Sequence, residues 1–290
     1  MSDSPQTSFN ELRLCLSPIF IIGSPRSGTS ILAGSMAQHT HLWTADESQF
    51  LWDLFYDGRA DANFQRVGRA DGGSWLHNQG VGRAEFRAFL GLGLNALFTR
   101  QSQGRRWIDH TPVYTDLADL LAEMFPGAIF LHMLRDGRKV VHSMMNYLSI
   151  FRGDPKVLPW GTDFTEACIQ WRHFVEVSME FAARHPARCL TVTNEALVAD
   201  PDNSFRKIFA FMGVPFEEAP ASFFRENRWN SSFLTIADQR PSGSDPWNEW
   251  TLEQRRAFAA VAGQTLIKCG FATEEDLQLL DDQQGIGEAV

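Results

Sequence analysis

The sequence has few of the residues that indicate a metal-binding, redox or disulfide-stabilised protein. Its four cysteines, Cys15, Cys168, Cys189 and Cys269, are scattered over 290 residues, and no two of them form a C-x-x-C pair. Metal and thiol redox sites need clustered ligands. We therefore predict no metal site and four free thiols in a reducing compartment.

Long apolar segments are also absent. The first ten residues are polar and include Asp3, whereas a secretory signal begins with basic residues. The first apolar run, 14–22, is interrupted by Pro18 and is much shorter than the about 20 residues that cross a bilayer. We expect a soluble, cytoplasmic protein with no membrane span.

Positive charge is scarce, since 26 Lys and Arg stand against 35 Asp and Glu, for a net charge of −9. This balance argues against a nucleic-acid partner. Lysine is especially rare, so most of the basic residues are arginines. The planar guanidinium of arginine binds phosphate or sulfate through two hydrogen bonds, which lysine cannot do. A preference for arginine over the whole chain also fits codon usage.

Short apolar segments alternate with helical ones along the chain. Strands are predicted at 17–23, 106–109, 128–134 and 189–193, and helices at 31–37, 114–124, after 138, at 164–184 and at 204–212. This order indicates an α/β fold with a central, mostly parallel sheet and helices on both faces.

We treat 1–290 as a single domain, with the core strands and nucleotide-binding motifs concentrated in 14–150. The segment 57–83 is rich in glycine, and 226–250 is rich in Asn, Ser, Pro and Trp. Neither follows the alternation of strands and helices. Both are candidate lid or substrate loops.

A loop of phosphate-binding type follows the first predicted strand. Gly23-Ser-Pro-Arg-Ser-Gly-Thr-Ser30 has Gly-x4-Gly spacing between a strand and a helix, where backbone N–H groups and a helix N-terminus converge on an anion. The candidate binding residues are Ser24, Pro25, Arg26, Ser27, Gly28, Thr29 and Ser30. Thr29 stands where an ATP-binding Walker loop has lysine, and no strand ends in an obvious Mg²⁺-binding aspartate. These differences disfavour a kinase.

The loop and a second motif resemble those of the sulfotransferases that use 3′-phosphoadenosine 5′-phosphosulfate (PAPS). Pro25 to Ser30 resembles their segment for the 5′-phosphosulfate. Leu134-Arg-Asp-Gly-Arg-Lys-Val-Val-His-Ser143 resembles their 3′-phosphate segment, in which an arginine and a serine eight positions later hold the phosphate. The resemblance implies a three-layer, P-loop-like fold. It also implies PAPS as co-substrate, 3′,5′-bisphosphoadenosine (PAP) as product, and phosphate binding by Arg135 and Ser143.

The residues of the two motifs are most similar to those of tyrosylprotein and bacterial carbohydrate-type sulfotransferases. The segments 193–215 and 250–271 also resemble later segments of the family. There are two departures. Asn194 replaces a usual tyrosine, and the Gly-x-x-Gly-x-x-Lys loop of the cytosolic enzymes is absent. Arg240, in the late loop, is our candidate for a substitute phosphate contact.

Three residues are candidates for catalysis. Arg26 is suited to neutralise the leaving group. Glu47 matches the position of the catalytic glutamate in tyrosylprotein-type enzymes, near Trp43, Phe50 and Trp52. His110 matches the catalytic histidine of cytosolic enzymes. We favour Glu47 as general base with His110 as electrostatic partner. Structural roles also remain open: a loop-stabilising arginine, an acid at a helix start, and a His–Asp pair.

The acceptor is the least specified part. Aromatic residues after Glu47 are candidates for a pocket or for the core: Phe50, Trp52, Phe55, Tyr56, Phe64 and Trp75. The acidic, lysine-poor composition argues against an acidic peptide, so we expect a small-molecule, lipid or carbohydrate hydroxyl. A homodimer is compatible with this interpretation. The alternatives are a phosphotransferase with an altered P-loop and a non-catalytic relative that binds a nucleotide or a partner.

Overall fold

The computed structural model describes residues 13–59, 62, 64, 75–150, 158, 161, 163–227 and 245–278. Five parallel strands form one sheet in the order β2-β3-β1-β4-β5. The strands are β1 (Ile19–Ile22), β2 (Leu42–Thr44), β3 (Arg106–Asp109), β4 (Ile129–Leu134) and β5 (Cys189–Thr193). The predicted parallel sheet is confirmed, and β2 is an additional edge strand.

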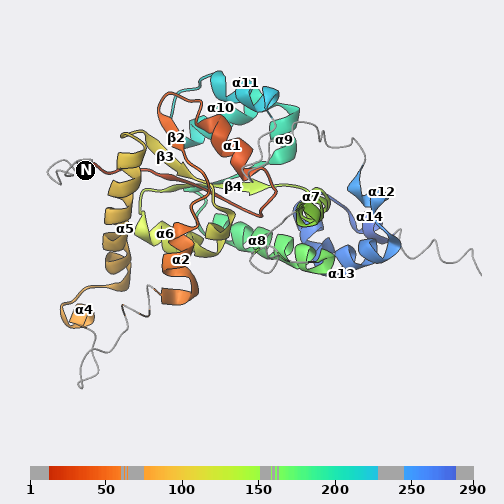
Figure 1. Ribbon diagram of the computed structural model, residues 1–290, viewed down its shortest axis with the longest axis horizontal. Coiled ribbons are helices and arrows are strands. Elements are labelled where there is room, and N and C mark those ends of the chain that lie inside the picture. Colours follow the sequence, from red (N-terminus) through yellow and green to blue (C-terminus); the bar gives the residue numbers. More distant parts are fainter. Residues whose placement is uncertain are drawn as a thin grey trace, which may run out of the picture.

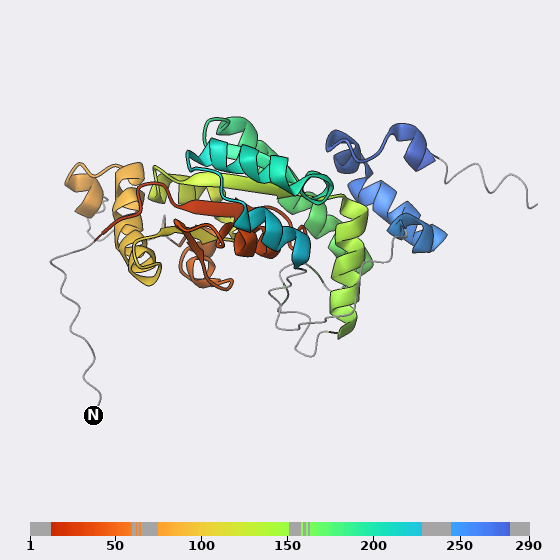
Figure 2. The same ribbon diagram turned by 90° about the horizontal axis from the view of Figure 1, so that it is seen from above.

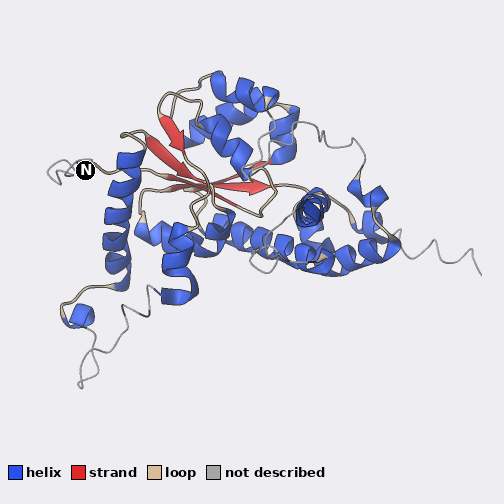
Figure 3. Cartoon of the chain, in the orientation of Figure 1, coloured by secondary structure: helices blue, strands red, loops and turns tan. Residues whose placement is uncertain are grey.

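Helices cover both faces of the sheet (Figures 1 and 3). Their bounds are α1 (Thr29–Met36), α2 (Phe50–Phe55), η2 (Tyr56–Gly58), α4 (Trp75–Asn78), α5 (Arg83–Gln101), η3 (Pro112–Leu117), α6 (Ala118–Met124), α7 (Gly137–Ile150), α8 (Phe164–Arg184), α9 (Asn194–Ala199), α10 (Pro201–Met212), α11 (Ala219–Glu226), α12 (Pro246–Glu249), α13 (Leu252–Lys268) and α14 (Glu274–Gln278). The three-layer α/β architecture is therefore confirmed.

The alternation of side chains along β1 explains the two core layers. Ile19 and Ile21 pack with α1, α10 and α11 on one face, whereas Phe20 and Ile22 pack with α6 and α8 on the other. Successive strand residues point to opposite faces, so a strand buried on both faces must be apolar throughout. All four β1 residues are fully buried.

A third apolar cluster joins α7, α8 and α13 beyond the sheet. Figure 2 shows α13 and α14 at one end of the molecule and α4 and α5 at the other. The start of α7 lies directly on α8, because a Cβ at Gly137 would come 2.6 Å from the Trp171 ring. Only glycine permits that approach, which sets the position of α7 beside the sheet.

Parts of the two predicted loops are helical. Within 57–83 the structure contains η2 and α4, and within 226–250 it contains α12. Most of both stretches lies outside the described residues. Among the helices that are described, none is both long enough and apolar enough to cross a membrane.

Candidate active site

The candidate residues gather at one edge of the sheet. Because all the strands are parallel, the loops that follow β1, β2, β3 and β4 leave the sheet at their carboxyl ends. These loops carry the phosphate loop, Glu47, His110 and Arg135. Residues from four distant parts of the sequence therefore face one region, as is usual for open α/β sheets.

Two glycines set the path of the phosphate loop. Gly23 has φ of 138°, and a Cβ there would lie 2.3 Å from the carbonyl oxygen of Met133 on the neighbouring strand. Gly28 has φ of 104° and is the N-cap of α1, where no side chain caps the helix. The first N–H groups of α1 have no partners within the helix. They are therefore available to an anion.

The hydroxyl groups of the loop are largely enclosed. Ser24, Ser27 and Thr29 are buried. The Ser27 Oγ has no hydrogen-bond partner among the described residues. A buried hydroxyl without a partner is costly unless a ligand completes it. This orphaned donor fits the phosphate-binding role that the sequence predicts for the loop.

Direct contacts join the two predicted phosphate motifs. The Arg26 Nε donates to Ser143 Oγ at 3.3 Å, and the Arg135 Nη1 donates to the Arg26 carbonyl at 2.9 Å. The Arg26 guanidinium also lies over the Tyr147 ring, 5.1 Å from its centroid. Arg26, Arg135 and Ser143 thus form one cluster.

The charges of this cluster suit an anion. Burial lowers the pKa of Arg26, and the nearby charge of Arg135 lowers it further, whereas Tyr147 and Glu47 oppose the shift. Two neighbouring guanidinium groups repel each other, so a bound phosphate between them relieves an unfavourable interaction.

Two residues that follow β5 brace this cluster. The Asn194 Nδ2 donates to the Ser27 carbonyl at 3.3 Å, so the residue that replaces the family's tyrosine supports the phosphate loop. The next residue, Glu195, accepts a hydrogen bond from the backbone N–H of Asp136 at 3.2 Å. Sequence analysis missed both contacts. Arg240 lies outside the described residues.

Glu47 lies beside the end of the phosphate loop. Its Oε1 accepts a hydrogen bond from the Ser30 hydroxyl at 3.4 Å. The side chain is exposed rather than enclosed by Trp43, Phe50 and Trp52, so the apolar surroundings that we expected are not found. Its charge nevertheless acts on Arg26, which places it near the other phosphate-loop groups.

A hydrogen-bond network holds the segment that carries Glu47. Ser48 Oγ pairs with Tyr114 Oη at 2.7 Å, and its backbone N–H donates to Thr111 Oγ1 at 3.1 Å. Tyr114 Oη also accepts from the backbone N–H of Leu51 at 2.9 Å. The loop after β3 thus fixes the loop after β2. Sequence analysis missed this network because its members are more than 60 residues apart.

His110 is buried at the end of β3. Burial lowers the pKa of its imidazole to about 4, and the Asp46 charge opposes that shift only in part. Its Nδ1 lies 3.3 Å from Thr44 Oγ1. The neighbouring Asp109 accepts from the Thr111 N–H and the Ser48 hydroxyl instead of pairing with His110. The lowered pKa favours the uncharged imidazole at neutral pH, and the role of His110 as electrostatic partner of Glu47 stays a prediction.

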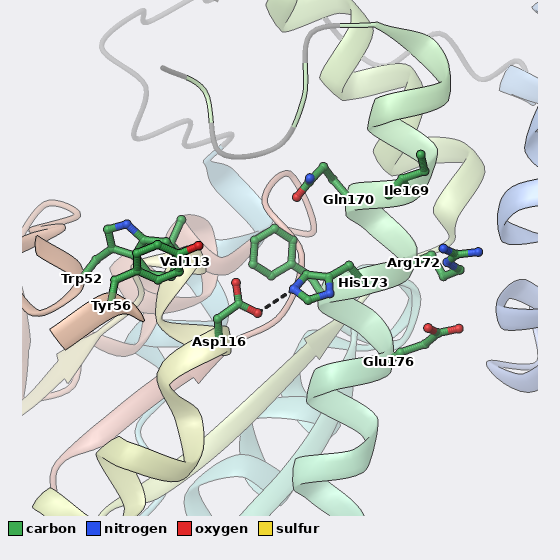
Figure 4. A pocket seen from close by; sticks show the side chains of 10 residues that line it. Trp52, Tyr56, Val113, Asp116, Ile169, Gln170, Arg172, His173 and Glu176 are labelled. Atoms are coloured by element: carbon green, nitrogen blue, oxygen red, sulfur yellow. Dashed lines mark hydrogen bonds and ion pairs between the residues drawn. The ribbon is translucent and has the colours of Figure 1, made fainter. Parts of the chain in front are cut away.

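A cavity of about 480 Å³ lies between α2, η2, η3 and α8. Figure 4 shows Trp52, Tyr56 and Val113 on one side and residues of α8 on the other, with Asp116 and His173 between them. Of the aromatic residues noted in the sequence, only Trp52 and Tyr56 line the cavity. Phe55 belongs to the core and Trp75 is exposed on α4. Among the described residues, no cluster of histidine, cysteine and carboxylate side chains could hold a metal ion.

Comparison with known proteins agrees with this site. Residues 18–218 match the profile of the sulfotransferase family. The chain belongs to this family. The matched range contains both phosphate motifs, Glu47 and His110.

Several relatives of the chain are named protein-tyrosine sulfotransferases. The chain is 28% identical over 209 residues to a protein-tyrosine sulfotransferase of Drosophila melanogaster, covering 69% of this chain and 39% of the relative. It is 26% identical over 205 residues to protein-tyrosine sulfotransferase 2 of Gallus gallus, covering 69% and 52%. The chain thus spans about half or less of the length of these relatives.

A solved structure shares the fold over nearly its whole length. This is a sulfotransferase domain from the curacin biosynthetic pathway, with a TM-score of 0.50 and 17% identity. The similarity covers 92% of this chain and 97% of that domain. At this level of identity the similarity concerns the fold alone.

Proposed function

We propose that this sulfotransferase-family protein moves a sulfuryl group from PAPS to a hydroxyl group of a small-molecule, lipid or carbohydrate acceptor. The observation that carries the proposal is the contact between the two phosphate motifs, in which Arg26 meets Ser143 at 3.3 Å and Arg135 meets the Arg26 carbonyl at 2.9 Å. Two guanidinium groups, a hydroxyl and an uncapped helix N-terminus suit a nucleotide with phosphates at both the 5′ and 3′ positions.

As co-substrate, PAPS supplies an activated sulfuryl group, and the residues of the chain do the rest. In the transfer the acceptor oxygen forms a bond to sulfur while the bond from sulfur to the phosphate oxygen breaks. The leaving PAP takes that electron pair, and the hydroxyl proton passes to a base. Arg26 stabilises the charge that develops on the leaving phosphate.

We propose Glu47 as the base, and two observations support it. Its carboxylate accepts a hydrogen bond from Ser30 of the phosphate loop, and its negative charge raises the pKa of Arg26. His110 is the competing base. Thr44 Oγ1 donates its proton to the Ile108 carbonyl at 3.0 Å, which leaves its oxygen to accept from His110 Nδ1–H. In that tautomer the Nε2 lone pair can take a proton.

The nucleotide site is tested by calorimetric titration with PAP, and with ATP and Mg²⁺ as the competing ligand. We expect metal-independent binding of PAP, weakened at least tenfold by Arg135→Ala, because a charge-assisted phosphate contact is worth about 1.5–3 kcal/mol. Arg100→Ala is the matched control, since this exposed arginine lies on α5, at the opposite end of the sheet from α7 (Figure 1).

Binding of ATP alone would replace the proposal with a phosphotransferase. Binding of neither nucleotide would favour a non-catalytic relative. The names of the relatives make a protein tyrosine the second acceptor to test. A tyrosine-containing peptide therefore belongs in the acceptor screen beside small hydroxyl compounds, with transfer of labelled sulfate from PAPS as the readout.

A further inference from the structure

The cavity between α2, η3 and α8 combines a stacked aromatic wall with a polar one. The rings of Trp52 and Tyr56 are stacked with their centroids 3.9 Å apart and an interplanar angle of 20°. Opposite them, α8 presents Gln170 and His173 to the cavity (Figure 4). The volume of about 480 Å³ lies within the usual range of small-molecule sites, about 300–1,000 Å³.

Residues next in sequence to both walls hydrogen-bond to the segments that carry the candidate site residues. Trp52 follows Leu51, whose N–H is bonded to Tyr114 in the network that holds the Glu47 segment. Asp116 follows Thr115, whose hydroxyl bonds both the N–H of Gly23 at 2.8 Å and its carbonyl at 3.2 Å. The helix η3 therefore lines the cavity with Val113 and Asp116 while its Tyr114 and Thr115 contact the Glu47 segment and the start of the phosphate loop.

The polar groups that remain for a ligand can be identified. Arg172 donates to the Val261 carbonyl at 3.0 Å, and Glu176 accepts from Thr265 at 2.6 Å, so α13 occupies both side chains. Asp116 Oδ1 pairs with His173 Nε2 at 2.7 Å. Within the described part of the chain, neither Asp116 Oδ2 nor the Gln170 amide has a hydrogen-bond partner. Asp116 Oδ2, the Gln170 amide and the His173 Nδ1 can therefore bind a ligand.

We propose that this cavity binds the acceptor and that the acceptor carries a neutral sugar ring; this inference rests on the proposed sulfotransferase function. The apolar face of a pyranose ring stacks on aromatic rings. Its hydroxyl groups both donate and accept, so they can satisfy a carboxylate oxygen, an amide and an imidazole together. An acidic sugar is disfavoured by Asp116 and Glu176, and a plain phenol would leave the polar wall unpaired.

The test is saturation-transfer NMR on the full chain with methyl β-glucopyranoside, methyl β-galactopyranoside and methyl N-acetyl-β-glucosaminide as probes. We expect signals from the ring protons of at least one glycoside. Tyr56→Ala and Asp116→Asn should each weaken binding at least tenfold, whereas Tyr56→Phe keeps the ring and should retain it. Phe89→Ala removes another exposed aromatic residue, on α5 and outside the cavity, and should have no effect.

Calorimetry with PAP on the same samples separates the two proposals. A protein that binds PAP but none of the glycosides overturns the sugar cavity and leaves the sulfotransferase function in place. Glycoside binding without PAP binding overturns the cavity's role as an acceptor site. Equal binding of phenol, or of methyl glucuronide, overturns the assignment to a neutral sugar.

Discussion

Arg26 connects several functional groups of the candidate site. Its guanidinium contacts Ser143 and lies over Tyr147, its carbonyl accepts from Arg135, and its backbone has the left-handed φ of 68°. Left-handed backbone costs about 1 kcal/mol or more in a non-glycine residue. The surrounding contacts hold that conformation, which places a positive charge where both phosphate motifs meet.

At the same scale, Glu47→Gln should lower kcat for sulfate transfer by a factor of about 10²–10⁴, because the amide cannot take the acceptor's proton. The affinity for PAP should change less than threefold, since Glu47 is not one of the proposed phosphate ligands. Steady-state kinetics and PAP calorimetry on the same variant measure the two effects. Full turnover by Glu47→Gln, together with loss of turnover in His110→Gln, would transfer the role of base to His110.

At the scale of elements, η3 holds together the loops that carry the candidate site residues. Tyr114 binds Ser48 and Leu51 on the segment before and within α2, and Thr115 binds Gly23 at the end of β1. This short helix begins at Pro112, two residues after His110, and proline is well tolerated at the first position of a helix. One element therefore sets the relative positions of the phosphate loop and both candidate bases.

Tyr114→Phe removes the hydroxyl that joins η3 to this segment. The Leu51 N–H then loses its partner, so we expect the free energy of unfolding to fall by about 1–3 kcal/mol. We also expect kcat to fall about tenfold with unchanged PAP affinity. Ser178→Ala is a suitable control, because it deletes a buried hydroxyl whose hydrogen bond, within the described residues, goes to the Phe174 carbonyl on α8. Equal loss of kcat in both variants would show that stability, not positioning, is responsible.

At the scale of the whole molecule, buried neutral histidines make stability depend on pH. Burial lowers the pKa of both His110 and His132 from 6.5 to about 4. The unfolded chain binds these protons more readily, so stability is fully present above pH 6.5 and falls as the pH decreases toward 4. Burial raises the pKa of Asp109, which acts in the opposite sense, because that contribution is lost as pH rises.

Urea unfolding at pH 6.5 and pH 5 measures this effect. Each histidine should contribute a loss of about 1.6 kcal/mol over that interval, from about 1.36 kcal/mol per pH unit and the half-protonated state of the unfolded imidazole at pH 6.5. His132→Gln removes one titrating group and leaves Asp109 and His110 in place. The difference between the two pH values should therefore shrink by about 1.6 kcal/mol in the variant. An unchanged difference would show that His132 is not a buried neutral group.

Local patterns predicted a large part of the fold. The bounds of β3, β5 and α8 agree with the prediction, because each has a compact apolar or amphipathic pattern of its own. The strand β2 was missed, since three residues, of which only Leu42 is fully buried, carry no such pattern. Likewise α5 was not predicted. Its Gly91 weakens the helical signal but is needed for packing, since a Cβ there would lie 1.9 Å from the Met124 carbonyl oxygen.

Local patterns between a strand and a helix are enough to predict the candidate phosphate loop, its lack of a Walker lysine and the second motif with Arg135 and Ser143. Three contacts come from the fold instead: Arg26 meets Ser143, Tyr114 holds the Glu47 segment, and the Trp52 and Tyr56 rings lie across a cavity from His173. These contacts depend on strand order and helix packing. Local hydrophobic periodicity predicts secondary structure and not such long-range contacts.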